Sequence, residues 1–336
     1  MEDTLLEIKN LKTSFRIEGN YYNAVDGVDI TIKKNEVFAI VGESGSGKSA
    51  MALSIPRLHN LNYTKIDGEV LFNGRNILSL TEKELNEVRG RGIAMIFQDP
   101  LSALNPLMKI GKQIEESLTY HTDLGKEAKK ERAIELLTEV GMVNPELTYS
   151  QYPHELSGGM RQRAMIAIAL SAKPELLIAD EPTTALDVTI QAQILDLLRK
   201  LQKETKSSII IITHDLGVVA EIADRVAVMY AGQVVETASV FELFKNPQHP
   251  YTRSLLNAMP TTTKDNTRLH AISGVVPPLQ YMKRTGCRFS PRIPWVESSE
   301  HEENPTYHEI SPGHIVLCSC YKNFKIDNSK KEAEVK

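Results

Sequence analysis

Short runs of branched apolar residues alternate with polar turns over the first 50 positions of the chain, a pattern typical of β-strands. It predicts strands at 5–11, 25–32 and 37–41. Gly27 and the polar residues at 33–36 are expected to separate them. Because the residues after Gly47 have a helical pattern, the last strand, a glycine-rich turn and a helix are predicted to open a βαβ unit.

Two later apolar runs, at 176–178 and 209–212, are continuous and do not alternate with polar residues. That pattern is typical of parallel strands that are buried on both faces. Between them, apolar residues recur at the i, i+3, i+4 and i+7 spacing of one helix face: Ile194, Leu197, Leu198 and Leu201. The chain is therefore predicted to have an α/β core with an amphipathic helix on the sheet.

The character of the chain changes in two places. Charged helical segments at 114–120 and 127–140 predict a helical subdomain, about 88–164, inserted into a domain that spans 1–260. After residue 260 the pattern becomes irregular, which predicts a C-terminal extension over 261–336. Its charged end, from about 327, is expected to be disordered.

Composition narrows the functions that this fold can serve. The chain has 336 residues, of which 41% are hydrophobic and 24% charged, as in ordinary globular proteins. Its formal charge of −4 gives no basic excess, so we expect no nucleic-acid partner. Three cysteines fit a reducing compartment. Because no apolar run approaches the roughly 20 residues of a membrane span, any membrane role is expected to depend on partners.

The segment 42–49 fits the phosphate-binding motif G-x-x-x-x-G-K-[ST] and lies between a predicted strand and a predicted helix. Its backbone N–H groups are expected to converge on phosphate oxygens, while Lys48 reaches the terminal phosphates and Ser49 ligates Mg²⁺. The residues predicted to contact the phosphates here are Gly42, Ser44, Gly45, Ser46, Gly47, Lys48, Ser49 and Ala50.

Polar residues follow two of the buried strands. Asp180 ends one strand and is the candidate to hold Mg²⁺ through water. The next residue, Glu181, is placed to orient or deprotonate the attacking water. His214 follows the strand at 209–212, where ligands of open α/β sheets bind, and is predicted to contact the γ-phosphate.

A second glycine-rich helix start, Leu-Ser-Gly-Gly-Met-Arg-Gln-Arg at 156–163, resembles the signature motif of ABC proteins. Together with the phosphate loop, Gln98, Asp180-Glu181, Ala185-Leu186-Asp187 and Thr213-His214-Asp215 in that order, it makes the chain similar to an ABC transporter ATP-binding subunit. The resemblance implies the ABC-type nucleotide-binding fold of P-loop NTPases, with an inserted helical subdomain. It also implies that Gln98 takes part in catalysis, ligates Mg²⁺ and links the metal to that subdomain.

Narrower resemblances lie at 97–106, 151–156, 180–189, 247–256 and 286–292. These segments are similar to the oligopeptide/dipeptide/nickel importer branch, including its C-terminal extension. They imply an ATP hydrolase that powers import of di- or oligopeptides, with nickel or metal-chelate import left open. A protein that acts on DNA or ribosomes without membrane subunits is disfavoured, because the chain has a single cassette.

The resemblance also implies an assembly of several subunits. Two ATPase subunits would lie head to tail, each ATP being held by one phosphate loop and by the other subunit's signature. Residues implied in these contacts are Ser157, Gly158, Gly159 and, across the interface, Asp187. Phe15 resembles the aromatic residue that stacks on adenine, with Tyr21 and Tyr22 as alternatives.

Further partners follow from the same family pattern. It implies a sister ATPase chain, two transmembrane permease subunits and, indirectly, an extracellular peptide-binding protein. The chain would then be peripheral to the cytoplasmic face of the membrane. ATP and Mg²⁺ are the expected ligands.

The C-terminal cysteines match only part of a family pattern. Members of the branch often carry four cysteines there, a number suited to a [4Fe–4S] cluster. Cys287 and Cys318 match two of the positions, whereas Ile293 and Glu300 occupy the other two. Other candidate ligands nearby are Cys320, His301, His308 and His314. A [4Fe–4S] cluster, a mixed-ligand metal site and reduced thiols all remain open, the reduced thiols being favoured.

Overall fold

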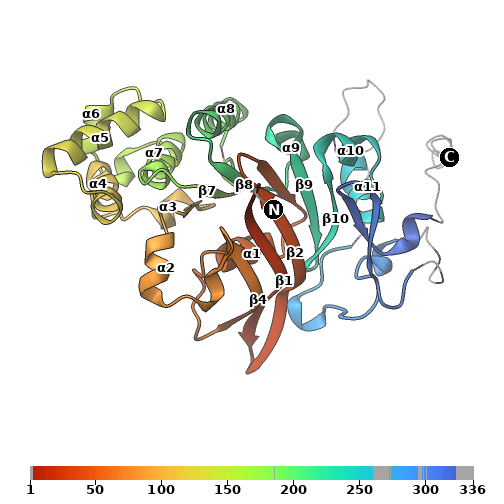
Figure 1. Ribbon diagram of the computed structural model, residues 1–336. Coiled ribbons are helices and arrows are strands. Elements are labelled where there is room, and N and C mark those ends of the chain that lie inside the picture. The colour runs from red at the N-terminus through yellow and green to blue at the C-terminus, as the bar shows by residue number, and fades with distance from the viewer. Residues whose placement is uncertain are drawn as a thin grey trace, which may run out of the picture.

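Two β-sheets of different topology organise the computed structural model (Figure 1). The structure describes residues 3–184, 186–259, 272, 274–293, 297, 299 and 301–322. The disordered tail expected from about 327 lies outside them. Within the described residues, no helix combines the length and the apolar content that a bilayer crossing needs.

The smaller sheet is antiparallel, in the order β2-β1-β4-β5. Its strands are β1 (Thr4–Ile17), β2 (Asn20–Lys33), β4 (Thr64–Phe72) and β5 (Arg75–Asn76). The first two form a hairpin whose turn residues, Glu18 and Gly19, both have positive φ, as a tight hairpin requires. Gly27 does not separate strands as predicted: it lies inside β2, with φ of 77°, where the pairing with β1 shifts by one residue.

The larger sheet has the order β11-β12-β10-β9-β3-β8-β7-β6. The five strands from β9 to β6 are parallel, while β10, β12 and β11 add antiparallel strands at one edge. Their bounds are β3 Val37–Val41, β6 Ile93–Ile96, β7 Leu176–Asp180, β8 Ser208–Thr213, β9 Arg225–Tyr230, β10 Gln233–Ser239, β11 Tyr307–Ser311 and β12 His314–Leu317. The parallel part confirms the α/β core expected from the continuous apolar runs.

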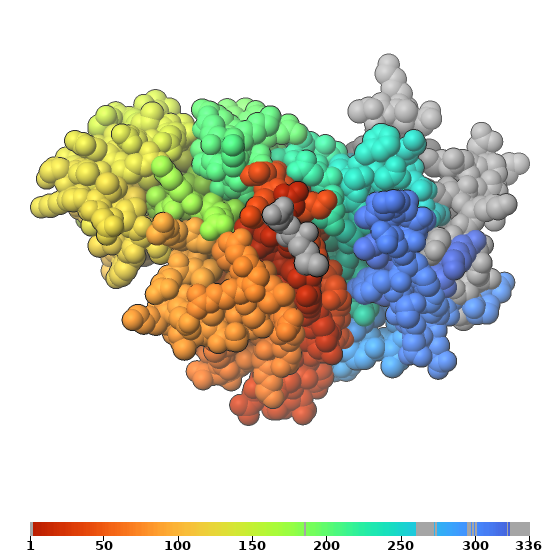
Figure 2. All heavy atoms as spheres, viewed as in Figure 1, coloured from red at the N-terminus to blue at the C-terminus, as the bar shows by residue number. Residues whose placement is uncertain are grey.

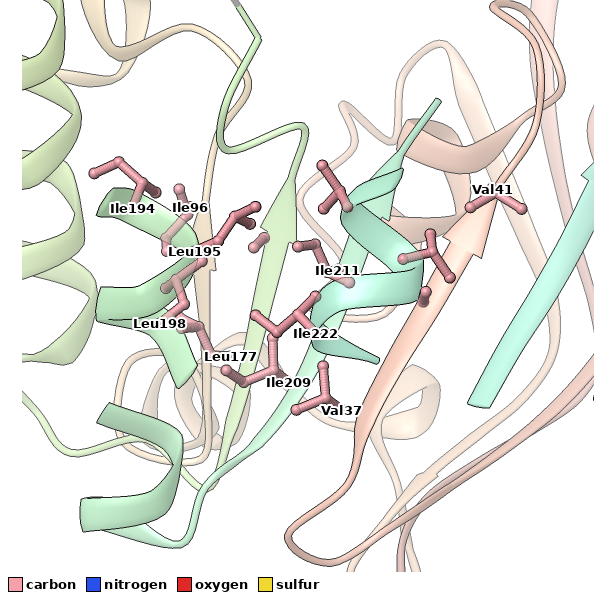
Figure 3. Packing of buried hydrophobic residues seen from close by; sticks show 14 of the residues in the cluster. Val37, Val41, Ile96, Leu177, Ile194, Leu195, Leu198, Ile209, Ile211 and Ile222 are labelled. Atoms are coloured by element: carbon pink, nitrogen blue, oxygen red, sulfur yellow. The ribbon is translucent and has the colours of Figure 1, made fainter. Parts of the chain in front are cut away.

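Apolar residues of the central strands pack on both faces of the large sheet. Along β8, Ile209 and Ile211 belong to one core cluster, whereas Ile210 and Ile212 belong to the other. The first cluster includes the stripe of α8 (Val188–Thr205), and Figure 3 shows Ile194 beside Ile96 of β6 and Leu198 beside Leu177 of β7. The second is shared with the antiparallel sheet and α1 (Lys48–Ser54). Burial on both faces explains why these strands are continuously apolar.

A group of helices projects at one end of the molecule (yellow in Figure 2). It comprises α3 Pro100–Ala103, α4 Ile110–His121, α5 Lys126–Glu139, α6 Pro145–Ser150 and α7 Gly158–Leu170. The range 88–164 thus also contains β6, which pairs with β7 in the large sheet. The helices themselves begin at Pro100, just after that strand.

The opposite end carries the extension (blue in Figures 1 and 2). Its strands β11 and β12 continue the large sheet from β10, so the irregular pattern after residue 260 conceals regular structure. The remaining helices are α2 Glu82–Val88, α9 Leu216–Ile222, α10 Val240–Lys245 and α11 Pro250–Asn257. Apolar residues of the extension, such as Phe289, pack with Tyr230 of β9 and Tyr251 of α11.

Candidate nucleotide site

The phosphate loop joins β3 to α1 in the arrangement that its motif needs. Gly47 ends the loop with φ of 102°, a conformation that L side chains rarely adopt. A Cβ atom at this position would lie 2.4 Å from the carbonyl oxygen of Ala24. Both the backbone conformation and the close approach therefore require glycine here.

Replacing Gly47 with alanine is expected to weaken ATP binding by about tenfold or more, because left-handed backbone costs an L residue roughly 1–2 kcal/mol before any clash with Ala24. Binding of a fluorescent ATP analogue measures the loss. The matched control is Gly125→Ala, where φ is −68° and a Cβ would meet nothing within 4 Å. Equal affinity in both variants would contradict this role of the loop.

Lys48 is buried beneath the loop. Its Nζ donates hydrogen bonds to the carbonyl oxygens of Gly42 and Glu43, at 2.8 and 2.9 Å. Burial lowers the pKa of Lys48, while the nearby carboxylates of Glu181 and Asp180 act in the opposite direction. The ammonium group is thus held inside the loop, among the atoms that would surround a phosphate chain.

Ser49 and Asp180 meet at the end of β7. The Ser49 hydroxyl donates to Asp180 Oδ1 at 3.1 Å. Burial raises the pKa of Asp180. The hydrogen bond from Ser49 acts in the opposite direction, and the negative charge of Glu181 raises the pKa further. A hydroxyl and a carboxylate are oxygen ligands of the kind that Mg²⁺ prefers, so the residues present fit this ion.

Glu181 is the point on which the other polar residues converge. Gln98 Nε2 and Thr184 Oγ1 donate to its Oε2 at 2.9 and 2.7 Å, and His214 Nδ1 lies 3.3 Å from its Oε1. Its backbone has φ of 46°, and its N–H donates to the carbonyl of Ile212 on β8. Burial opposes ionisation of Glu181, but the hydrogen bonds from Thr184 and His214 outweigh burial and hold its pKa below the usual value.

These contacts describe a carboxylate that is ionised at neutral pH and fixed in one orientation. Its side chain is 15% exposed, whereas that of His214 is 61% exposed. Because β7 and β8 are adjacent parallel strands, their carboxyl ends bring Glu181 and His214 to the same edge as the phosphate loop. The arrangement can orient a water molecule and accept its proton.

The signature segment lies apart from this site. Ser157 caps α7 by accepting a hydrogen bond from the N–H of Met160, and both Ser157 and Gly158 are exposed. Asp187 caps α8 by accepting from Ile190, and it too is exposed. Among the described residues, no hydrogen bond or ion pair joins Ser157, Gly158, Gly159 or Asp187 to the phosphate loop.

Phe15 lies on β1, with Tyr22 opposite it on β2. Its ring contacts His59 edge-on at 5.4 Å between centroids, and His59 Nε2 lies 2.7 Å from the carbonyl of Ala50 in α1. Tyr21 instead lies under the ammonium group of Lys65. Phe15 is therefore connected to the helix that follows the phosphate loop, and Tyr22 shares its cross-strand position.

Sequence reasoning missed two features of the site. Thr184 is one, although its spacing of three residues from Glu181 is a usable signal. The other is an ion pair from the extension: Arg292 donates to both carboxylate oxygens of Glu43, at 2.6 and 3.1 Å. The N–H of Glu43 also donates to the hydroxyl of Tyr251. No local pattern predicts these contacts, because more than 200 residues separate the partners.

Comparison with known proteins places this geometry in a family. The ABC transporter model matches residues 25–184, and the model for the oligopeptide/dipeptide transporter C-terminal region matches residues 235–298. A solved dimeric structure, the post-hydrolysis state of the ATP-binding cassette MJ0796 bound to ADP and Pi, is 30% identical with a TM-score of 0.63. The match covers 70% of this chain and 98% of that one. Fold and site thus define an ABC-type nucleotide-binding domain.

Relatives with curated names resemble the chain over nearly its whole length. It is 49% identical to the oligopeptide transport ATP-binding protein OppD of Lactococcus lactis subsp. cremoris (strain SK11), over 98% of this chain and 97% of that one. It is 53% identical to the oligopeptide transport ATP-binding protein OppD of Bacillus subtilis (strain 168), over 93% and 87%. The chain belongs to the family of oligopeptide and dipeptide transport ATP-binding proteins of ABC transporters.

Proposed function

We propose that this chain hydrolyses ATP to power the import of di- or oligopeptides through an ABC transporter. The observation that carries the hydrolytic part is the convergence of Gln98, Thr184 and His214 on Glu181, beside the phosphate loop. Support for the peptide cargo comes from relatives named for oligopeptide and dipeptide transport at 49–53% identity. Those names favour peptide over nickel or metal-chelate cargo.

In the proposed reaction, water attacks the γ-phosphate of ATP in line with the leaving oxygen. Lys48 and the backbone of the loop hold the phosphates, and Glu181 orients the water and accepts its proton. His214, hydrogen-bonded to Glu181, contacts the γ-phosphate. Mg²⁺, when bound, neutralises phosphate charge; Ser49, Gln98 and, through water, Asp180 are the residues that would hold it.

A second ATPase subunit completes each site in this proposal. Ser157 and Gly158 are exposed and Gly159 is half-buried at the start of α7, so this helix start is accessible to a nucleotide bound by another subunit. Asp187 is also exposed and would lie at the interface. We propose that the second subunit is a sister chain, as the resemblance implies.

Membrane coupling is proposed to run through the segment after Gln98. Leu101 is 58% exposed and Leu107 is 86% exposed, which leaves apolar surface for a partner. Two permease subunits would dock there at the cytoplasmic face of the membrane, and an extracellular peptide-binding protein would deliver the cargo to them. Movement of the helical part during ATP hydrolysis would reach the permeases through this segment.

The proposal is tested in vesicles that contain the reconstituted transporter. We expect ATP-dependent uptake of a radiolabelled peptide, no uptake of radiolabelled nickel, and faster ATP turnover than the isolated chain shows. Uptake of nickel without peptide would overturn the peptide assignment while leaving the ATPase intact. Turnover that is equal in the isolated chain and the complex would contradict the shared site.

A further inference from the structure

The C-terminal cysteines do not fit a four-cysteine [4Fe–4S] cluster. Such a cluster takes one thiolate for each iron, and the chain contains three cysteines in all. At one of the positions where the family often has cysteine, Ile293 is 2% exposed and belongs to the apolar core. Another such position, Glu300, lies outside the described residues. The ligands that the chain does carry must therefore be judged on their own arrangement.

Cys318, Cys320 and His301 come together just after β12. One ligand atom from each lies within 4.8 Å of the other two. Cys287 lines a small internal cavity together with Cys318 and supplies a fourth candidate. All three cysteines are free and buried. Cys287 thus brings a third segment of the chain next to this three-ligand group.

The spacing of these atoms suits a single ion. Ligands of one tetrahedral zinc, at about 2.3 Å for sulfur and 2.0–2.1 Å for nitrogen, lie roughly 3.5–3.8 Å apart. Thiolates on a cluster bind different irons and must lie further apart. The ligand atoms of His301, Cys318 and Cys320, which lie within 4.8 Å of one another, need only a small contraction to match a mononuclear site. The sulfur-rich set suits zinc.

His301 supplies an independent observation. Both of its ring nitrogens are shielded from solvent, and neither has a hydrogen-bond partner among the described residues. A buried imidazole without partners loses its hydrogen bonds to water and gains none in exchange. Metal coordination by one of these nitrogens would compensate for that loss. The neighbouring hollow of about 810 Å³, which His301 and Cys287 line, offers a path for an ion from the surface.

We propose that Cys287, His301, Cys318 and Cys320 bind one divalent zinc ion in a tetrahedral structural site. Three thiolates and one neutral imidazole would leave one excess negative charge on the bound site. Arg253 is near enough to Cys320 to interact with it electrostatically and to offset this charge. The ion would join the end of β12 to the segment that carries Arg292, which contacts the phosphate loop through Glu43.

Metal binding by the full-length chain tests the proposal. After treatment with a chelator, the chain is titrated with Co²⁺ and then with Zn²⁺ under reducing conditions. We expect saturation at one Co²⁺ per chain, visible absorption of a tetrahedral cobalt–thiolate centre, and its loss on addition of Zn²⁺. Absence of this absorption, or iron and sulfide in the protein as purified, would overturn the assignment.

Variants identify the ligands. Cys320→Ser is expected to weaken Co²⁺ binding at least tenfold. His301→Cys should still bind one Co²⁺ per chain, and its thiolate-to-cobalt absorption band should be more intense. This result would distinguish metal ligation by residue 301 from a role in folding alone. His308→Ala is the control, because this neighbouring histidine is hydrogen-bonded to Glu302 and lies outside the proposed ligand set. A spectrum unchanged by either ligand variant would exclude that residue from the site and contradict the proposal.

Discussion

Replacing Glu181 with glutamine is expected to lower ATP turnover by about 100-fold or more, because a positioned general base contributes roughly 10²–10⁴ in rate. The glutamine side chain keeps the size of the original and still accepts from Thr184, but it cannot take a proton from water. Turnover by the assembled transporter measures the effect. Nucleotide affinity should remain, since Lys48 and the loop backbone are unchanged.

Glu175→Gln is the matched control for that experiment. Glu175 is exposed and lies just before β7, at the end of the strand away from Glu181. Among the described side chains, it forms a hydrogen bond only with Asn73. The same chemical change there should leave turnover within twofold. If Glu181→Gln retained most of the native rate, the proton would have to go elsewhere and the assigned role of Glu181 would be wrong.

Replacing Arg292 with methionine is expected to lower the free energy of unfolding by about 2 kcal/mol and to weaken ATP binding. Removing one member of a buried ion pair typically costs about 3–5 kcal/mol, because the remaining charge is left uncompensated. The cost should be smaller here, since Glu43 is 28% exposed while Arg292 is 7% exposed. Chemical unfolding and nucleotide titration measure the two effects.

A double variant separates the ion pair from general damage to the extension. Glu43→Gln together with Arg292→Met removes both charges, so part of the lost stability should return. Arg284→Met is the control, because its pair with Asp26 is longer, at 3.6 Å, and Arg284 is more exposed than Arg292, at 32%. If the double variant were no more stable than Arg292→Met alone, the Glu43 carboxylate would not be the source of the loss.

Local sequence patterns predicted the helices and strands whose buried positions recur regularly along a single segment. The strand at 37–41 matches β3 residue for residue, because all five positions are buried. The strands predicted at 5–11 and 25–32 were too short. β1 and β2 continue through polar residues that alternate with buried ones, and long antiparallel pairing stabilises those ends. The stripe of α8 was correct because it faces a single apolar surface.

The nucleotide site also contains some residues that sequence patterns predict and some features that they do not. Lys48 and Ser49 could be placed from the phosphate-loop motif, because they begin the helix that follows the loop. Asp180, Glu181 and His214 could be placed because they lie at the carboxyl ends of two buried strands, and such ends share one edge of a parallel sheet. The left-handed backbone of Glu181 was not predictable, because no residue type at that position announces it. Nor was the contact of Arg292 with Glu43, which depends on how the extension folds back.

The extension also determines which strand forms the edge of the large sheet. β12 pairs with β10 at Glu236 and Thr237, and Glu236 is fully buried while it accepts hydrogen bonds from Gln248, His249 and His314. A cassette cut at residue 260 would leave this edge of β10 unpaired. It would also leave the buried carboxylate of Glu236 without its partner His314. Open edges of this kind recruit strands from other molecules. The extension thus covers this edge of the sheet, and we expect the cassette expressed without it to aggregate more readily.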